Sequence, residues 1–440
     1  YFEPARNWSV ISFREKKLAV TICEDIWNLG DDSLYPHCPL DQLVSQQPDL
    51  VLNLSASPFD YTHLEDRKAI LKQNVSKYKL PMLYCNAVGS QTEIVFDGGS
   101  LVMDAYGNLV QQLPLFEESM RYVDWKGDGR FTQPVLATAT QLPDAEWNPD
   151  ALEPKTGMAE IHRALVLGIR DYFSKMGFKQ AILGSSGGID SAVTLALAVE
   201  ALGKENVRAV LLPSPFSSTH SVADAKSLSD RLGNPYDIVP IDRVFESFLL
   251  ELKPLFSGHS FGLAEENMQS RIRGNFLMSI ANKFGYILLN TSNKSELATG
   301  YGTLYGDMAG GLAVLGDCYK LQVYELARYI NRNKEIIPES ILTKAPSAEL
   351  RPNQKDSDSL PDYSVLDPIL YQYIERRQGP DSIVAMGFDR SIVERTIRLV
   401  NVNEYKRHQF CPILRVSPKA FGAGRRMPIV AHYHADKKFS

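Results

Sequence analysis

The sequence predicts an α/β protein built from two domains. Short apolar runs that read as buried strands alternate with helical stretches in both halves of the chain. A glycine- and serine-rich loop at residues 184–191 joins one of these strands to a helix. A polar, proline-rich stretch separates the halves. We therefore expect a first domain over residues 1–127, a linker over 128–155 and a second domain over 156–440.

The composition limits what the chain can do. Its 440 residues are 44% hydrophobic and 22% charged, with a formal net charge of −5, so nucleic acid is not an expected partner. No apolar run approaches the ~18 residues of a membrane span, and no signal peptide is visible. Five scattered cysteines without a CxxC pair favour a reducing, cytoplasmic setting. The chain opens at Tyr1 inside an apparent domain and reads as part of a longer protein.

The first half alternates strands and helices and then closes on a hairpin. A helix is expected from Thr62, which has capping-box spacing to Glu65. Ala105-Tyr-Gly-Asn108 provides the turn chemistry of the hairpin. The expected strands are 17–22, 50–54, 81–86, 100–104 and 108–113, and the helix spans 62–79.

Cys23 stands where the first of these strands ends, followed by two acidic residues. A cysteine on a turn at a strand end is a candidate nucleophile. The alternative is a small buried hydrophobic residue, which is the usual role of a free cysteine, and local chemistry alone favours it. We expect Cys85, inside a strand-like run, to belong to the core.

The second half repeats the strand–helix alternation over a longer span. We expect a parallel sheet, because strands that alternate with helices form βαβ units. The expected helices are 158–176, 192–199, 220–232 and 265–283, and the expected strands are 180–183, 206–212, 236–241 and 286–290.

The loop after strand 180–183 predicts an anion site. Glycines let backbone N–H groups approach an oxyanion, serines add hydroxyl donors, and the helix start adds partial positive charge. No Gly-Lys-Ser/Thr follows, so this is not a Walker loop. The alternative is a glycine-rich turn without a ligand. The residues of the loop are Gly184, Ser185, Ser186, Gly187, Gly188, Ile189, Asp190 and Ser191.

Two later stretches are candidates for substrate contacts. Asn267 and Arg271 stand four residues apart, hence on one helix face, and a guanidinium suits a carboxylate. Spacing alone favours a solvated charged face instead, and Arg273 should point elsewhere. Residues 344–362 are polar and interrupted by prolines, which indicates a mobile segment or a lid.

The loop SGGIDS resembles the pyrophosphate-binding loop of the ATP pyrophosphatases. With CEDIW, NLSASPF, ENMQSRIRG, ELATGYGTLYGD and KAPSAELRPNQ, the chain resembles the two-domain glutamine-dependent NAD synthetases. The resemblance implies a nitrilase-like α-β-β-α layered domain, incomplete at its start. A Rossmann-like parallel-sheet adenine nucleotide alpha-hydrolase domain would follow.

In the second domain, the resemblance implies sites for ATP, Mg²⁺ and nicotinate adenine dinucleotide (deamido-NAD). Besides the loop, the implied ATP contacts are Thr291, Lys320 and Ser347. Those implied for deamido-NAD are Asn267, Arg271, Glu296, Tyr301, Thr303 and Lys406. Asp190 and Glu296 would bind Mg²⁺, which prefers carboxylate and phosphate oxygens.

In the first domain, the resemblance implies a Glu-Lys-Cys triad with Cys23 as nucleophile. Glutamine would be held by Glu24, Ser57 and His63, although the family usually has Lys or Arg at the position of His63. The glutamate and lysine of the triad lie upstream of the cysteine and cannot be assigned in this chain. A polypeptide that began at Tyr1 should therefore lack glutaminase activity.

The expected function is ATP-dependent amidation of deamido-NAD to NAD through an adenylated intermediate, with ammonia from glutamine. The family also implies a homo-oligomer. Two alternatives stay open: another ATP pyrophosphatase, such as a GMP-synthetase-like enzyme or a tRNA thiolase, and an ammonia-only synthetase whose amidase-like domain is structural.

Overall fold

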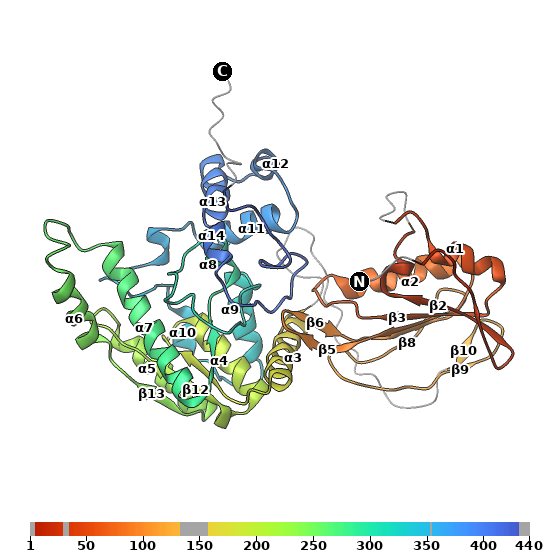
Figure 1. Cartoon of the computed structure of the whole chain (residues 1–440), viewed down its shortest axis with the longest axis horizontal. Coiled ribbons are helices and arrows are strands. Elements are labelled where there is room, and N and C mark those ends of the chain that lie inside the picture. Colours follow the sequence, from red (N-terminus) through yellow and green to blue (C-terminus); the bar gives the residue numbers. More distant parts are fainter. Residues whose placement is uncertain (1–4, 30–34, 133–156, 353, 431–440) are drawn as a thin grey trace, which may run out of the picture. The chain divides into compact units, whose positions relative to one another are not determined.

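The computed structural model describes residues 5–29, 35–132, 157–352 and 354–430 (Figure 1). The chain divides into two compact units, one made mainly of residues before 150 and the other of residues from 158 onward. Most of the linker expected at 128–155 lies outside the described residues, and the exact domain boundaries stay a prediction. In the described part of the chain, no helix is both long and apolar enough to cross a membrane.

The first unit contains a six-stranded mixed sheet in the order β1-β2-β3-β4-β7-β8. β2, β3 and β4 are parallel neighbours, and the outer pairs are antiparallel. Two antiparallel pairs, β5 with β6 and β9 with β10, stand apart from it. The elements are β1 (Ile11–Phe13), β2 (Lys16–Ile22), α1 (Pro39–Leu43), β3 (Leu50–Ser55), α2 (His63–Tyr78), β4 (Met82–Asn86), β5 (Val88–Gln91), β6 (Ile94–Asp97), β7 (Leu101–Met103), β8 (Leu109–Gln112), β9 (Asp124–Trp125) and β10 (Phe131–Thr132).

The helices α1 and α2 pack on one face of this sheet (Figure 1). Leu40 and Leu71 of the helices join Val51 and Met82 of the strands in one buried cluster. The opposite face carries exposed side chains, so the prediction that Cys85 is a core residue is wrong. Side chains alternate between the faces of a strand, and Cys85 points away from the face that the helices cover.

The start of α2 differs in detail from the sequence prediction. The helix begins at His63, one residue after the expected start, and Thr62 makes no side-chain cap, so the predicted capping box is wrong. The Thr62 hydroxyl instead donates a hydrogen bond to Asp60 Oδ1 over 2.7 Å, and the Thr62 N–H donates to the same oxygen over 2.8 Å. A nearby carboxylate thus competes successfully for the capping hydroxyl.

The second unit is built on a five-stranded parallel sheet in the order β13-β12-β11-β14-β15. This is the Rossmann-like arrangement that the sequence predicts, so the α/β class is confirmed. The first elements are α3 (Met158–Met176), β11 (Ala181–Gly184), α4 (Ile189–Leu202), β12 (Val207–Leu211), α5 (Thr219–Leu232), β13 (Tyr236–Ile238), α6 (Asp242–Leu252), α7 (Leu263–Phe284), β14 (Ile287–Asn290), α8 (Lys294–Thr299) and β15 (Leu312–Ala313). They are followed by α9 (Lys320–Ile330), α10 (Glu339–Thr343), α11 (Tyr363–Ile374), α12 (Pro380–Ala385), α13 (Arg390–Val402) and α14 (Glu404–Arg407).

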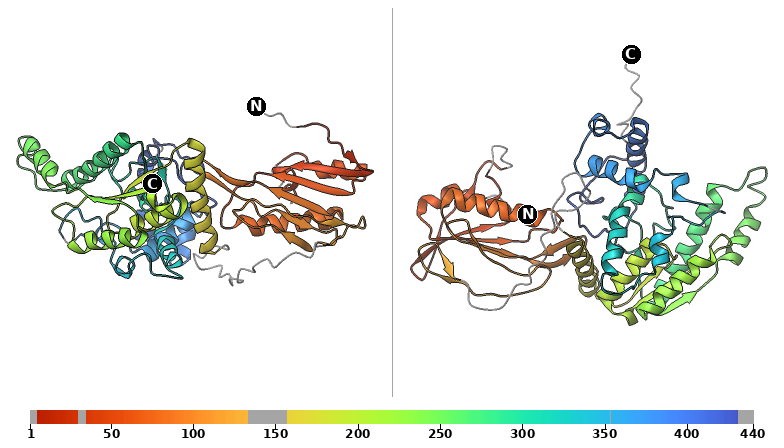
Figure 2. Two further views of the ribbon diagram at one scale, coloured as in Figure 1. Left: turned by 90° about the horizontal axis from the view of Figure 1, so that it is seen from below. Right: turned by 180° about the vertical axis from the view of Figure 1, so that it is seen from behind.

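Helices cover both sides of this sheet (Figure 2). Phe245 of α6 and Met268 and Ile272 of α7 pack with Ile182 and Val210 of the strands in one buried cluster. The helices α3, α4 and α9 pack against one another in a separate group. Both sides of the central strands are therefore buried, which explains why these strands read as short continuous apolar runs in the sequence.

The strand order sets where a ligand can bind. The chain runs from β11 to its neighbour β12 on one side and later returns to β14 on the other side of β11. At such a switch point the loops at the carboxyl ends of the strands separate and leave a crevice. The loops after β11, β12 and β14 line one cavity there.

Candidate active site

The loop between β11 and α4 has the backbone geometry of an anion site. Gly187 adopts a left-handed φ of +78°. A Cβ at this position would lie 2.2 Å from the backbone oxygen of Ser221, at the start of α5. Only glycine satisfies both constraints, since L-residues avoid this φ and the close neighbour is backbone. The loop can therefore lie tightly against α5 and open its N–H groups toward the crevice.

Serine hydroxyls brace the same loop. Ser191 Oγ donates to Gly188 O over 3.0 Å and accepts from Ser186 N over 3.3 Å, while Gly188 N donates to Ser186 Oγ over 3.2 Å. The hydroxyl of Ser185 is buried and has no hydrogen-bond partner among the described residues. A buried polar group without a partner is costly, and an oxyanion in the crevice would satisfy it.

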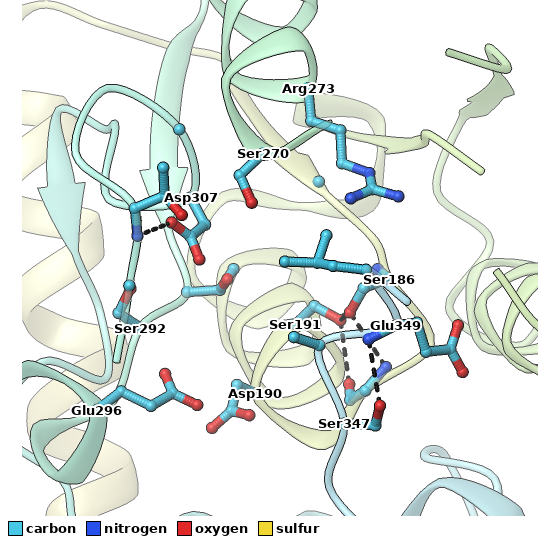
Figure 3. A pocket seen from close by; sticks show the side chains of 18 of the residues that line it. Ser186, Asp190, Ser191, Ser270, Arg273, Ser292, Glu296, Asp307, Ser347 and Glu349 are labelled. Atoms are coloured by element: carbon cyan, nitrogen blue, oxygen red, sulfur yellow. Dashed lines mark hydrogen bonds between the residues drawn. The ribbon is translucent and has the colours of Figure 1, made fainter. Parts of the chain in front are cut away.

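This loop lines a cavity of about 570 Å³ (Figure 3). All the residues that the sequence assigns to the second domain's site line it. They are Gly184, Ser185, Ser186, Gly187, Gly188, Ile189, Asp190, Ser191, Asn267, Arg271, Thr291, Glu296, Tyr301, Thr303, Lys320, Ser347 and Lys406. Their proximity is a finding, whereas the role of each stays a prediction.

Lys320 lies between two carboxylates at one end of the cavity. Its Nζ is 2.5 Å from Asp190 Oδ2 and 3.5 Å from Glu296 Oε1. Asn293 Nδ2 donates to Asp190 Oδ1 over 2.8 Å and so orients that carboxylate. The lysine side chain is 3% exposed, which makes this a nearly dry cluster in which electrostatic interactions are strong.

Burial and the charge of Asp190 together raise the pKa of Glu296 to about 8. Burial alone would lower the pKa of Lys320, but the two carboxylates outweigh it and raise that pKa. The cluster therefore holds one ammonium and a carboxyl group that is easily protonated near neutral pH. A second cation in the cluster would favour the ionised form of Glu296.

This donor set fits Mg²⁺ in the company of a phosphate. In the described part of the chain, no group of three or more His, Cys, Asp or Glu side chains is arranged to hold a metal by itself. Mg²⁺ is commonly held by one or two carboxylates together with substrate phosphates. Asp190 and Glu296 beside the loop match that requirement.

The side of the cavity lined by Asn267 and Lys406 is held together by hydrogen bonds between distant segments. Thr303 Oγ1 donates to Asn267 Oδ1 over 2.7 Å, joining the segment after α8 to α7. Lys406 Nζ donates to the carbonyl oxygens of Gly300 over 2.7 Å and Gly302 over 2.8 Å. Lys406 thus fixes the backbone that carries Tyr301, in addition to lining the cavity.

The two arginines of α7 differ from the sequence prediction. Arg271 is exposed at the cavity, and its Nε donates to Leu304 O over 3.3 Å. Arg273 was expected to point elsewhere, but it is half-buried and lines the same cavity, so that expectation is wrong. Its Nε donates to Leu212 O over 2.9 Å, and Figure 3 shows its head turned into the pocket. α7 crosses the cavity closely enough for two of its faces to contribute.

The segment after α10 covers part of the cavity. Ser347 Oγ donates to Gln354 O over 2.6 Å, which closes the segment into a compact loop. Glu349 Oε1 accepts from Ser221 Oγ over 2.7 Å and pairs with Lys344 Nζ at 2.6 Å. Glu349 has a left-handed φ of +49°, so this contact holds the backbone in a costly conformation. Residues 344–350 of the segment therefore line the cavity, and the function of a lid stays a prediction.

Asp356 anchors the other end of this segment. Its Oδ1 accepts from Tyr301 Oη over 3.2 Å and its Oδ2 from Tyr363 Oη over 3.0 Å. Sequence reasoning missed Arg273, Glu349 and Asp356 as site residues. Each acid has one partner far away in the sequence, Ser221 for Glu349 and Tyr301 for Asp356, and no local pattern reveals these contacts.

In the first unit, Cys23 lies on a strained turn at the end of a strand. It follows β2 directly and has a left-handed φ of +47°. Its Sγ is 3.5 Å from the backbone N–H of Ala56, just after the neighbouring strand β3. Asn53 Nδ2 donates to its carbonyl oxygen over 3.3 Å. The strained turn holds the sulfur, half-buried, at the shared carboxyl edge of two parallel strands.

Ser57 lies in the same corner, one residue after Ala56. Its N–H donates to Asn86 Oδ1 over 2.8 Å, and its Oγ accepts from Arg67 Nε over 3.1 Å. Arg67 is fully buried and pairs with Asp97 at 2.8 Å. A buried ion pair thus fixes the loop that carries Ser57 close to Cys23.

Glu24 and His63 have partners within the first unit. Glu24 accepts a short hydrogen bond from the Tyr35 hydroxyl. His63 Nδ1 is 3.0 Å from Asp60 Oδ2, and its ring centroid is 5.2 Å from that of Trp27. Hydrogen bonds from His63 and Thr62 outweigh burial and hold the pKa of Asp60 below its usual value.

The second unit is therefore a nucleotide-binding α/β domain of the adenine nucleotide alpha-hydrolase type, with an anion loop, an acid pair and a lysine around one cavity. The family model described as NAD synthase matches residues 161–410. The chain is 46% identical to the glutamine-dependent NAD(+) synthetase of Synechocystis, over 99% of this chain and 76% of that protein. It is 43% identical to the glutamine-dependent NAD(+) synthetase of Thermotoga maritima, over 98% of this chain and 78% of that protein.

A solved structure shows the same relationship. The glutamine-dependent NAD⁺ synthetase from Acinetobacter baumannii, in complex with adenosine diphosphate, is 39% identical with a TM-score of 0.71, covering 99% of this chain and 76% of that chain. The chain belongs to the glutamine-dependent NAD(+) synthetase family, whose members are ligases that use ATP and glutamine. The alternative of a GMP-synthetase-like enzyme or a tRNA thiolase is thereby overturned.

Gly187→Ala tests the geometry of the loop. The substitution adds both backbone strain and a clash with Ser221 O, so ATP affinity should fall at least tenfold and the free energy of unfolding by about 1–3 kcal/mol. Gly177→Ala is the matched control, because its φ is +75° but nothing lies within 4 Å of the added Cβ. Calorimetric titration with ATP and urea unfolding measure both effects. Equal ATP affinities in the two variants would contradict the close approach.

Glu296 makes stability depend on pH. A carboxyl group whose folded-state pKa is raised stabilises the fold while it is protonated, and this contribution is lost as pH rises. Without Mg²⁺, the free energy of unfolding should fall by up to about 1.4 kcal/mol per pH unit between its ordinary pKa and about 8. Glu296→Gln should flatten this part of the profile, and Glu251→Gln, at an exposed position, should not. Parallel profiles for the wild type and Glu296→Gln would refute the assignment.

Proposed function

We propose that the protein converts deamido-NAD to NAD in two chemical steps within the cavity of the second unit, using ATP and ammonia. One observation carries the proposal. The anion loop, the Asp190–Glu296 pair with Lys320, and the wall around Asn267 all face a single cavity. Phosphates, a divalent cation and a second anionic substrate can therefore meet there.

In the first step, a carboxylate oxygen of the nicotinate attacks the α-phosphorus of ATP. A C–O–P bond forms, the bond from the α-phosphorus to the bridging oxygen breaks, and pyrophosphate leaves with the electron pair. The N–H groups of the loop and the hydroxyls of Ser185 and Ser186 would hold the leaving pyrophosphate. The protein's contribution is positioning and charge stabilisation.

Asp190 and Glu296 would hold Mg²⁺ in this cavity. Bound Mg²⁺ supplies positive charge that offsets the charge of the phosphates. Lys320, already between the two carboxylates, adds a donor for a phosphate oxygen at the same place. Asn267, Arg271, Thr303 and Lys406 would orient deamido-NAD, with Arg271 suited to its carboxylate.

In the second step, ammonia attacks the activated carboxyl carbon, loses a proton, and displaces AMP to leave the amide of NAD. We propose that the ammonia comes from glutamine through attack by the Cys23 thiolate. Glutamine would lie against Glu24, Ser57 and His63, and water would hydrolyse the thioester. The strained turn at Cys23 and its proximity to Ala56 N support this role.

A cytoplasmic location and a homo-oligomer remain predictions.

Replacing Asp190 by Asn together with Ser191 by Ala tests the ATP chemistry. Both residues belong to the loop and its acid cluster, so AMP formation from radiolabelled ATP with deamido-NAD and ammonia should fall at least about a hundredfold. Asp230→Asn, on the exposed face of α5, should behave as the wild type. The wild type should release AMP, pyrophosphate and NAD in equal amounts. Undiminished AMP release by the double variant would refute the proposed site.

Cys23→Ala separates the two nitrogen sources. Glutamine-driven NAD formation by the full-length protein should be abolished, while ammonia-driven formation continues at the wild-type rate. Cys85→Ala is a matched control, because Cys85 is exposed near the carboxyl end of β4 in the same sheet. If the wild type uses only ammonia, the first unit is structural and the role of Cys23 is wrong.

A further inference from the structure

Arg273 places a positive charge in the cavity, and neither step of the proposed reaction involves it. Its Nε is held by the carbonyl oxygen of Leu212 at 2.9 Å, just after β12. Figure 3 shows the rest of its planar head turned toward the loop at Ser186. Within the described part of the chain, its two terminal nitrogens have no hydrogen-bond partner. The hydrogen bond to Leu212 therefore fixes the orientation of the guanidinium, and its two terminal nitrogens can donate to a ligand.

Among the residues that the structure describes, no carboxylate forms an ion pair with this arginine. The nearest acids by electrostatic effect are Asp307 and Glu349, and each has other partners. Asp307 Oδ1 accepts from Thr303 N over 2.5 Å, and Glu349 is held by Ser221 and Lys344. Burial accordingly lowers the pKa of Arg273 to about 10. An unpaired cation in such a place costs stability, which indicates that it serves a ligand.

The strand order indicates which phosphate of ATP the Arg273 guanidinium would contact. The loop follows β11, the central strand, and Arg273 is anchored beside the end of β12. The Asp190–Glu296–Lys320 cluster includes α8, which follows β14 on the opposite side of β11. Pyrophosphate on the loop thus has the acid cluster on one side and Arg273 on the other. The phosphate next to pyrophosphate, on the β12 side, would lie within reach of the guanidinium.

We propose that Arg273 binds a non-bridging oxygen of the α-phosphate of ATP and keeps it after transfer to the nicotinate carboxylate. This inference rests on the proposed adenylation. The oxygens of the α-phosphate remain negatively charged in ATP, in the adenylated dinucleotide and in AMP, so one guanidinium can follow the phosphorus through both steps. The bond made is carboxylate oxygen to α-phosphorus, and the bond broken is α-phosphorus to the oxygen of the departing pyrophosphate. The two terminal N–H groups of a planar guanidinium suit the non-bridging oxygens of this phosphate.

Calorimetric binding of ATP, AMP and adenosine tests the assignment without turnover. Arg273→Met should weaken ATP and AMP about 10- to 100-fold and leave adenosine unchanged, since only the phosphate contact is lost. Arg273→Lys should recover part of the loss, because it keeps the charge but not the fork. Lys283→Met removes an exposed charge from the last turn of the same helix and should change none of the three.

A melting curve without ligand separates binding from a structural role. Arg273→Met should melt at the wild-type temperature or higher, because it removes a half-buried cation that has no ion-pair partner among the described residues. The proposal is overturned if AMP and adenosine weaken equally, if only deamido-NAD binding weakens, or if the variant melts lower with unchanged ATP affinity. Failure of the proposed function would look different: the wild type would bind AMP yet form none from ATP and deamido-NAD.

Discussion

The second unit depends on the position of one ammonium group. Lys320, at the start of α9, lies between Asp190 in the first turn of α4 and Glu296 in the first turn of α8. Two ionised carboxylates so close together would repel each other in a site that excludes water. The ammonium group of the lysine offsets this repulsion. The same contacts bring the starts of these three helices to one point beside the cavity. In the proposed function, this point would hold the metal-bound phosphates.

A second cation and a covering segment complete the cavity. Arg273 lies on the β12 side of the loop and Lys320 on the β14 side, so positive charge flanks the loop on both sides. Glu349 and Asp356 pin the segment between α10 and α11 to α5 and to Tyr301. These anchors tie the described residues of the segment to Ser221 and Tyr301, which both line the cavity.

Much of the fold and of the site could be predicted from the sequence, and the failures have physical causes. The helix at 158–176 and the loop of residues 184–191 are encoded by local periodicity and glycine chemistry, so the structure matches them closely. Cys85 was misjudged because burial in a strand depends on which sheet face the helices cover. Arg273 was misjudged because helical spacing ignores the reach of a long side chain beside a wide cavity. The contact of Glu349 with Ser221 joins residues more than a hundred positions apart, which no local pattern reveals.

The most direct measurement follows an oxygen atom. Deamido-NAD labelled with ¹⁸O in its nicotinate carboxylate would be converted with unlabelled ATP and ammonia, and the products would be analysed by mass spectrometry. If the carboxylate attacks the α-phosphorus, one ¹⁸O atom must leave with AMP, because ammonia displaces the whole phosphate from the acyl carbon. Label found in pyrophosphate or in inorganic phosphate, with none in AMP, would contradict the account of this cavity.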